Sequence, residues 1–353
     1  MTKPATPLLT RDQGLAIKAL CIIIVMLHNY LHLRGYAAEN EFQFYQERAD
    51  AMWQMLLHPG IRTPLDFVCF TAPYVLAGFL FVSGYGLVKK YEQSSTVFNR
   101  FGFIGAHYTK LVRLVLLPLL LAFVAFWLVH DYWPLSWRDR LVELLLLGNL
   151  QYNRISIYPF VYWYLGMAMQ LYLLYALLLH RRQSYPLWHQ LLLLALVIGC
   201  VVWQMCCNPT GYTIYFLRVN MVGYVGPFVA GIVAARHLDH ISLKPWQWWI
   251  VVLVSGAVTV WSLWHFYSWI LGWIPAAVFI VSLVKACRYL RWRPIVWLGG
   301  ISAMAYVMHP IARELVIGFT HHHIRLELLI YLAASVLLAA GYAWLLRRIR
   351  PRR

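Results

Sequence analysis

The chain contains ten runs of apolar residues, each about as long as a membrane is thick. An α-helix needs about 20 apolar residues to cross the hydrocarbon core, because each residue adds about 1.5 Å. Hydrophobic residues make up 61% of the 353 residues and charged residues 12%, whereas soluble domains are roughly half apolar and a quarter charged. The sequence therefore predicts an all-α, polytopic membrane helix bundle in which residues 1–353 form one domain.

A shorter apolar run, 141–150 ("LVELLLLGNL"), is too short to cross the membrane and is predicted to be an interfacial or re-entrant piece. The ten predicted spans cover approximately residues 14–33, 65–88, 111–130, 160–180, 187–207, 219–235, 247–266, 268–285, 295–318 and 326–346.

The positions of Lys and Arg orient these spans. With the N-terminus in the cytoplasm, 21 of them fall inside and 8 outside, and Arg313 within a span completes the 30. Cytoplasmic loops are enriched in Lys and Arg, so ten spans with both termini cytoplasmic are predicted. A span at 141–150 would place the later "HRR" and "RWR" segments outside. Topology and attraction to anionic membrane lipids thus explain the net charge of +17, and no nucleic-acid partner is predicted.

Other features exclude some classes of protein. The six cysteines form no Cys-x-x-Cys pair and have no His partners at zinc spacing, so neither a disulfide framework nor a metal site is predicted. Lys18 interrupts the first apolar run and no small-residue cleavage site follows, which indicates a retained span rather than a signal peptide. No internal repeat of the kind that marks many transporters is visible.

The first span, "GLAIKALCIIIVMLHNYLHL", carries Lys18, His28 and His32. Burying a titratable group in a membrane costs a few kcal/mol, so such a residue is a functional hypothesis. Lys18 can extend its amine to the cytoplasmic interface, and a plain anchoring role stays open for it. His28 is too short for that and needs a polar partner or a water-filled cavity, although a structural role stays open. His32 shares a face with His28 and is predicted to be interfacial.

Two further segments, at the predicted cytoplasmic side, also carry residues that suit a functional site. Ser83 and Gly84 in "FVSGYGL" are small residues that permit close helix packing. Lys110 and Arg113 lie three residues apart at the start of the span 111–130, and together they suit an anionic ligand such as a phosphate. An ordinary anchoring role at the membrane surface is the alternative for this pair.

A third place, "ISAMAYVMHPIARE", puts His309 and Arg313 one turn apart in the outer half of the membrane, with Glu314 as a local partner. These residues and His28 describe a polar cavity lined by histidines, which is reached from a basic mouth on the cytoplasmic side. A neutral imidazole can act as a general base toward a hydroxyl, and the basic mouth suits a phosphorylated donor.

At these residues the sequence resembles the membrane acyltransferase-3 family, whose members mostly O-acylate bacterial surface glycans. The resemblance covers nearly the whole chain in motif order and includes "FVSGYGL", "YTKLVRLVLLP", "VYWYLGMAMQLYLLYALL" and "WLGGISAMAYVMHPIAREL". The residues that match the family's motifs are His28, Ser83, Gly84, Tyr85, Lys110, Arg113, Pro118, Trp163, Ser302, Tyr306 and His309.

The resemblance implies a ten-helix bundle in the bacterial cytoplasmic membrane that transfers an acyl group, commonly acetyl from acetyl-CoA, to a hydroxyl. His28 would be the catalytic base or a transient acyl carrier, and Lys18, Lys110 and Arg113 would hold the donor's phosphates. Acyl-CoA would be a co-substrate rather than a permanently bound cofactor. The acceptor would be a cell-envelope glycan or a lipid-linked sugar, while the acyl chain length and the oligomeric state are not specified.

Two positions depart from the family pattern. Lys18 precedes His28 by ten residues where the family usually has an Arg eleven residues before, and Ala77 stands where an Asp often precedes the Ser-Gly pair. The group that orients His28 is therefore open, with Asp66 and Glu314 as candidates. Two other functions also stay open: a transporter or exporter of a glycan or small anion that uses the histidines as a relay, and a non-catalytic scaffold.

Overall fold

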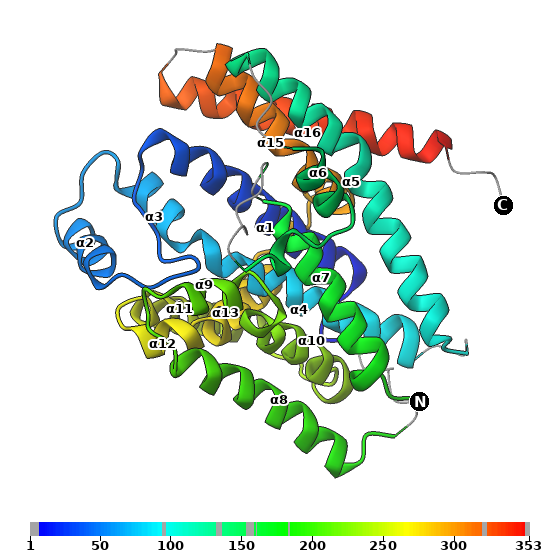
Figure 1. The fold of residues 1–353 in the computed structure, drawn as a ribbon. Coiled ribbons are helices and arrows are strands. Elements are labelled where there is room, and N and C mark those ends of the chain that lie inside the picture. Colours follow the sequence, from blue (N-terminus) through cyan, green and yellow to red (C-terminus); the bar gives the residue numbers. More distant parts are fainter. Residues whose placement is uncertain are drawn as a thin grey trace.

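The computed structural model describes residues 7–93, 97–131, 136–152, 159, 161–182, 184–319 and 323–349. Every regular element in these ranges is helical, which confirms the predicted all-helical class (Figure 1). The α-helices are α1 (Arg11–Leu31), α2 (Gln46–Leu57), α3 (Thr63–Thr71), α4 (Leu76–Leu87), α5 (Arg100–His130), α6 (Trp137–Leu144), α7 (Trp163–Leu174), α8 (Leu187–Met205), α9 (Tyr212–Arg218), α10 (Val225–His237), α11 (Pro245–Ser262), α12 (Phe266–Leu271), α13 (Trp273–Ala286), α14 (Arg293–Gly300), α15 (Ser302–Phe319) and α16 (Ile324–Ile349).

Each of the ten predicted spans contains helix in the structure, but they differ in length. Among the described residues, five helical segments are long and apolar enough to cross a membrane: Arg11–Arg34, Thr63–Glu92, Arg100–His130, Leu187–Met205 and Ile324–Arg348. The pair α14 and α15 makes a sixth if it is counted as one span. The count of ten spans and the cytoplasmic placement of both termini stay predictions.

The prediction of one continuous span over 295–318 needs correction. Helices α14 and α15 meet at an angle of 79°, and Ile301 lies between them. Gly299 and Gly300 directly precede the break, and glycine is among the weakest helix formers. A Cβ on Gly299 would overlap the carbonyl oxygen of Leu15, so the close crossing of α14 and α1 requires a glycine there.

The run 141–150 does not form a spanning helix. It contains the end of the eight-residue helix α6 and a short 3₁₀ turn over Gly148–Leu150. Leu146 lies between the two and has a φ of 61°. This left-handed conformation is uncommon for residues other than glycine and is incompatible with a continuous right-handed helix. An eight-residue helix is only about 12 Å long, so this segment agrees with an interfacial or re-entrant piece.

One set of contacts joins segments that are all predicted to face the cytoplasm. The Tyr85 hydroxyl donates a hydrogen bond to Asp239 (2.6 Å), which also forms an ion pair with Lys89. The backbone amide of Leu8 donates to Asp239 (3.2 Å), and the Lys285 amine donates to the Leu8 carbonyl (3.0 Å). The start of the described chain therefore lies against the ends of α4, α10 and α13.

A second set of contacts joins segments that are all predicted to face outside. Arg34, which follows α1, forms an ion pair with the buried Glu327 at the start of α16, and its Nη2 lies 2.6 Å from Oε1. The Arg218 guanidinium donates to the backbone carbonyl of Glu41 (3.3 Å). Each set joins only segments that are predicted to lie on the same side of the membrane, so the contacts agree with the predicted orientation. Of the residues used for that prediction, Lys3, Arg154, Arg350, Arg352 and Arg353 lie outside the described residues.

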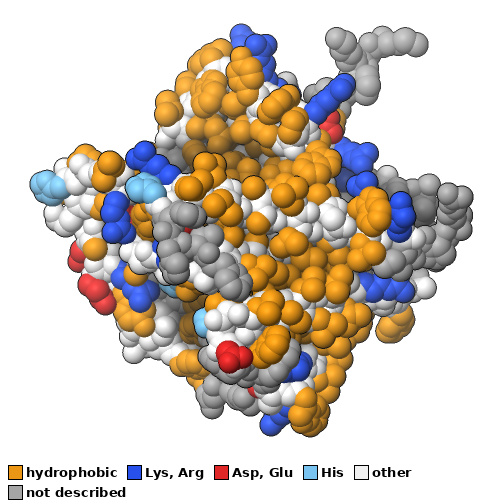
Figure 2. Space-filling view, turned by 90° about the horizontal axis from the view of Figure 1, so that it is seen from above, with side chains coloured by type: hydrophobic (Ala, Val, Ile, Leu, Met, Phe, Trp, Pro, Cys, Tyr) orange, Lys and Arg blue, Asp and Glu red, His pale blue; other side chains and the backbone are white. Residues whose placement is uncertain are grey.

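The surface of the bundle is rich in exposed hydrophobic side chains, and Figure 2 shows them over much of one face. On α8, for example, Leu191, Leu194, Ile198 and Val202 are each about half exposed. Contiguous apolar surface of this kind is unfavourable in water, whereas in a bilayer it contacts lipid chains. This surface supports the membrane placement of the long helices.

Candidate active site

A cavity of about 480 Å³ lies beside the C-terminal end of α1. We call it the outer cavity, after the orientation predicted from the sequence. Its walls come from α1 and the segment that follows it, from residues 72–76, which lead into α4, and from α5, α7 and α15. The side chains that line it are Val25, His28, Asn29, His32, Leu33, Glu39, Glu41, Phe42, Ala72, Pro73, Leu76, Phe126, Val161, Trp163, Tyr306, Arg313 and Glu314.

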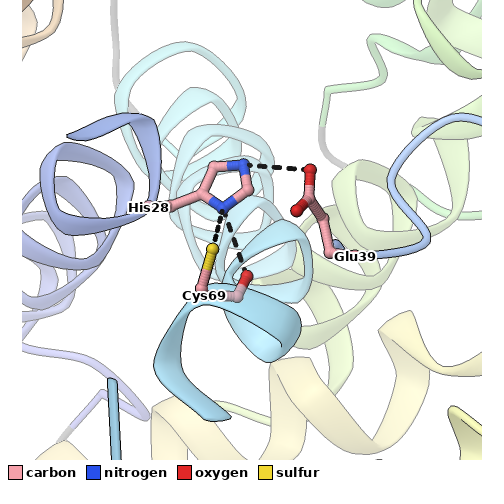
Figure 3. A group of neighbouring side chains, drawn as sticks. All are labelled: His28, Glu39 and Cys69. Carbon is pink, nitrogen blue, oxygen red and sulfur yellow. Dashed lines mark hydrogen bonds and ion pairs between the residues drawn. The ribbon is translucent and has the colours of Figure 1, made fainter. Parts of the chain in front are cut away.

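His28 is held by a backbone group on one side of its ring (Figure 3). Its Nδ1 lies 3.2 Å from the carbonyl oxygen of Cys69 in α3. A carbonyl can only accept a hydrogen bond, so we assign the proton of the neutral ring to Nδ1. Nε2 is then unprotonated and faces two carboxylates, Glu39 at 3.7 Å and Glu41 at 3.9 Å. A ring fixed in this way can take up a proton at Nε2.

Glu39 is buried, with 4% of its surface exposed, and its carboxylate also lies 3.2 Å from Nδ1 of His32. Burial acts to raise the pKa of Glu39, but it is outweighed by the hydrogen bond with His32 and by the positive charges that His28 and His32 carry when they are protonated, so the pKa is lowered. Glu39 is therefore a carboxylate at neutral pH. A negative charge at this place stabilises the imidazolium that forms when His28 takes a proton.

Glu39, Glu41 and Cys69 were not among the candidates from the sequence. Both glutamates lie in the segment that leads from α1 to α2 and folds back over His28. One feature of the sequence could have pointed to the two glutamates. They follow His28 by only 11 and 13 residues, in a chain that has only 13 acidic residues. Periodicity within a helix does not predict contacts made by a returning loop.

The two residues proposed from the sequence to orient His28 lie elsewhere. Asp66 accepts a hydrogen bond from the amide of Ala37 (2.9 Å), lies 3.8 Å from Arg62, and lines a different cavity. Glu314 does line the outer cavity, but its carboxylate lies 2.7 Å from Nε2 of His130. The orienting contact is therefore the Cys69 carbonyl, with Glu39 and Glu41 on the opposite side of the ring.

His28, Glu39 and Cys69 also offer ligand atoms that lie within 4.8 Å of one another, as in some metal sites. The Cys69 thiol, however, lies on the Nδ1 side of the ring, at 3.8 Å, while Glu39 faces Nε2. A single ring nitrogen cannot point at both groups, and Nδ1 already faces a carbonyl. This geometry suits an oriented base better than a metal ligand, and the prediction of no metal stays a prediction.

A second cavity of about 160 Å³, here called the inner cavity, lies toward the opposite end of α1. Lys18 from α1 and Lys110 from α5 line it together with Ser83 and His107. Arg113 is exposed and is not among the lining residues. The remaining lining residues are Phe79, Leu80, Leu111, Leu114, Tyr164, Leu165, Ala168, Leu171, Tyr172, Phe228, Ser302, Ala303 and Tyr306.

Tyr306 on α15 lines both cavities. Its hydroxyl donates a hydrogen bond to the carbonyl of Val161, and its ring lies 5.2 Å from that of Tyr164. Trp163, which the sequence also singled out, lines the outer cavity. One aromatic side chain therefore separates a basic inner cavity from an outer cavity lined by histidines and carboxylates.

Three other candidates serve packing or lie outside both cavities. His309 is fully buried beneath Tyr306, and its Nδ1 lies 2.7 Å from the Tyr306 carbonyl. Tyr85 belongs to the contacts around Asp239 described above. Gly84 packs against α10, because a Cβ there would overlap the carbonyl oxygen of Phe228.

Comparison with known families agrees with the motifs. A family model described as an acyltransferase domain matches residues 16–346, nearly the whole chain. Comparisons with curated proteins and with solved structures gave no match. The match confirms the resemblance inferred from the ordered motifs, and the long apolar helices agree with an enzyme that resides in a membrane. The chain belongs to the acyltransferase-3 family of membrane acyltransferases.

Proposed function

We propose that the protein transfers a short acyl group, such as acetyl, from acyl-CoA to a hydroxyl of a cell-envelope glycan or lipid-linked sugar. The observation that carries this proposal is the pair of cavities that share Tyr306. Lys18 and Lys110 at the inner cavity suit the phosphates of the donor. His28 in the outer cavity suits the proton transfer that activates the acceptor.

In the proposed reaction, the acceptor hydroxyl oxygen attacks the thioester carbonyl carbon. A C–O bond forms, the C–S bond breaks, and the hydroxyl proton moves to Nε2 of His28. The Glu39 and Glu41 carboxylates stabilise the resulting imidazolium, and the proton then passes to the departing CoA thiolate. A thioester is already activated, so the protein supplies mainly positioning and a base. A general base of this kind contributes about 10²–10⁴ in rate.

The proposal includes the topology. With ten spans and both termini in the cytoplasm of a bacterial cell, the inner cavity opens toward the acyl-CoA pool and the outer cavity toward the envelope. The two sets of contacts between loops support this orientation, since each set joins loops of one predicted side only. The observed helices that are too short to span alone, such as Trp163–Leu179 and Trp273–Ala286, would cross together with the adjoining segments.

The test is incorporation of isotope-labelled acetyl into envelope glycan fractions. Cells with the native gene, with the gene deleted, and with His28→Ala are compared at matched membrane abundance. We expect label to disappear in both altered lines, and the labelled fraction then identifies the acceptor. Exposed Glu47, which does not line the outer cavity, supplies the matched control: Glu47→Ala should keep the label. Equal label in native and deleted cells would contradict acetyl transfer.

A further inference from the structure

Arg313 on α15 is a buried arginine that lines the outer cavity, with 5% of its surface exposed. Its Nε is buried without a hydrogen-bond partner among the described residues. Arg218 and Arg236 also have one orphaned guanidinium nitrogen each, but their guanidinium groups have other partners. Arg236 forms an ion pair with Glu92 (2.7 Å), and the Arg218 guanidinium lies 4.2 Å from the ring of Trp269 and donates to a backbone carbonyl.

A buried charge without a partner is costly, because the loss of hydration is of the order of several kcal/mol. A chain retains such a group when something else in its working state compensates the charge. Guanidinium groups match carboxylates and phosphates best, since their donors fit two oxygens at once. The burial and the orphaned Nε of Arg313 therefore indicate an anionic group in the outer cavity.

The carboxylates of the same cavity are already engaged with histidines. Glu39 contacts both His28 and His32, and Glu314 contacts His130. Glu41 lies 3.9 Å from His28. These contacts leave the guanidinium on the α15 wall as a positive charge that a ligand can reach.

We propose that Arg313 forms an anion subsite for the acceptor, so that the acylated hydroxyl belongs to a sugar that also carries a carboxylate or a phosphate. This inference rests on the proposed function and narrows its substrate class. The anionic group would sit against α15 while the neighbouring hydroxyl faces Nε2 of His28. Neutral sugars would then lack the contact that holds the acceptor in place.

The test uses purified full-length protein in lipid nanodiscs and three probes: methyl glucoside, methyl glucuronoside and methyl glucoside 6-phosphate. Binding is measured as the probe-dependent rise in Tm, which needs no catalysis. We expect an anionic probe to bind about 10- to 100-fold more tightly than the neutral one, the usual value of a charged hydrogen bond. A larger effect of the glucuronoside points to a uronic acid acceptor, and a larger effect of the phosphate points to a phosphorylated or lipid-linked sugar.

Arg313→Gln should abolish the preference for the anionic probe, Arg313→Lys should keep part of it, and Arg62→Gln should keep all of it. Arg62 is exposed and lies outside the outer cavity, so its substitution removes the same charge elsewhere. Without probe, Arg313→Gln should melt at the native temperature or above, because an unpaired buried charge is removed. A lower Tm, or equal binding of all probes by the native protein, would overturn the proposal.

The binding test and the labelling test separate the two proposals. If anionic probes bind through Arg313 but no envelope fraction acquires label, the anion subsite stands and acetyl transfer fails. If label depends on His28 but Arg313→Gln leaves the probe preference unchanged, the transfer stands and the anion subsite is wrong.

Discussion

Nδ1 of His28 lies 3.2 Å from the backbone carbonyl of Cys69, which ties the histidine of α1 to the neighbouring helix α3. The contact uses a backbone atom, so the ring is held by the fold of α3 rather than by a particular side chain. The groups that act on the other side of the ring are side chains, and they can be changed one at a time.

Glu39→Gln should lower kcat by about 10- to 100-fold, which corresponds to about 1.4–2.8 kcal/mol of transition-state stabilisation. The amide keeps the size of the carboxylate but cannot stabilise an imidazolium at Nε2 of His28. The KM for acyl-CoA should stay unchanged, because Glu39 lines the outer cavity and not the inner cavity, where the donor is proposed to bind. Steady-state kinetics with labelled acyl-CoA measures both values. Glu47→Gln, on the exposed face of α2, is the matched control, and an equal loss there would refute the assignment.

Lys110→Ala should raise the KM for acyl-CoA by about tenfold with a smaller change in kcat, since one charged contact to a phosphate is worth roughly 1.5–3 kcal/mol. Arg113→Ala should have a weaker effect, because Arg113 is exposed and does not line the inner cavity. The two residues lie three apart on one helix, and each substitution removes one positive charge. A difference between the two variants therefore reports on the inner cavity rather than on the net charge of the protein. A stronger effect of Arg113→Ala would place the donor outside the inner cavity.

Gly84→Ala should destabilise the fold by about 1–3 kcal/mol or more, because the new methyl group would overlap the Phe228 carbonyl oxygen and force α4 away from α10. Gly86→Ala, two residues along the same helix, has no atom within 4 Å of the added Cβ and should be neutral or stabilising. Thermal unfolding in detergent, followed by helical circular dichroism, compares the two variants. Equal melting temperatures would mean that the helices are not in contact at Gly84.

Glu143 should make the protein less stable as the pH rises. Burial and the nearby charge of Asp139 raise the pKa of Glu143 to about 8, whereas an unfolded glutamate has a pKa of about 4.3. The folded state therefore holds a proton that the unfolded state loses, and stability falls as the pH rises from about 4 to about 8. Glu143→Gln should remove this dependence and melt higher than the native protein at pH 9. Parallel pH curves for the two proteins would contradict the raised pKa.

The sequence predicted helix positions well because long apolar runs leave the backbone no other way to satisfy its hydrogen bonds in a membrane. His28, Arg313 and Glu314, which the sequence groups by their depth along two predicted spans, all line the outer cavity. The break at Ile301 was not predicted, because glycines are common inside membrane helices and only the contact of Gly299 with Leu15 shows why this pair matters.

The partners of the candidate base were harder to predict. Asp66 is one of the two candidates from the sequence, yet its carboxylate accepts a hydrogen bond from the amide of Ala37. Glu39 reaches His28 because the segment after α1 turns back over the cavity, and that path depends on tertiary contacts such as Trp269 donating to the Asn40 carbonyl (2.7 Å). Contacts between segments more than 200 residues apart leave no periodic trace in a single sequence.

The contact between α1 and the start of α16, through Glu327, has a consequence for biosynthesis. Glu327 accepts hydrogen bonds from Tyr30 and Arg34, which were made almost 300 residues earlier. At 5–20 residues per second, roughly 15–60 s separate the emergence of α1 from that of α16. Until the end of this interval α1 lacks contacts with α16, and for nearly all of it the outer cavity lacks its α15 wall. A nascent chain that stops before α15 therefore carries His28 on a helix without a completed cavity around it.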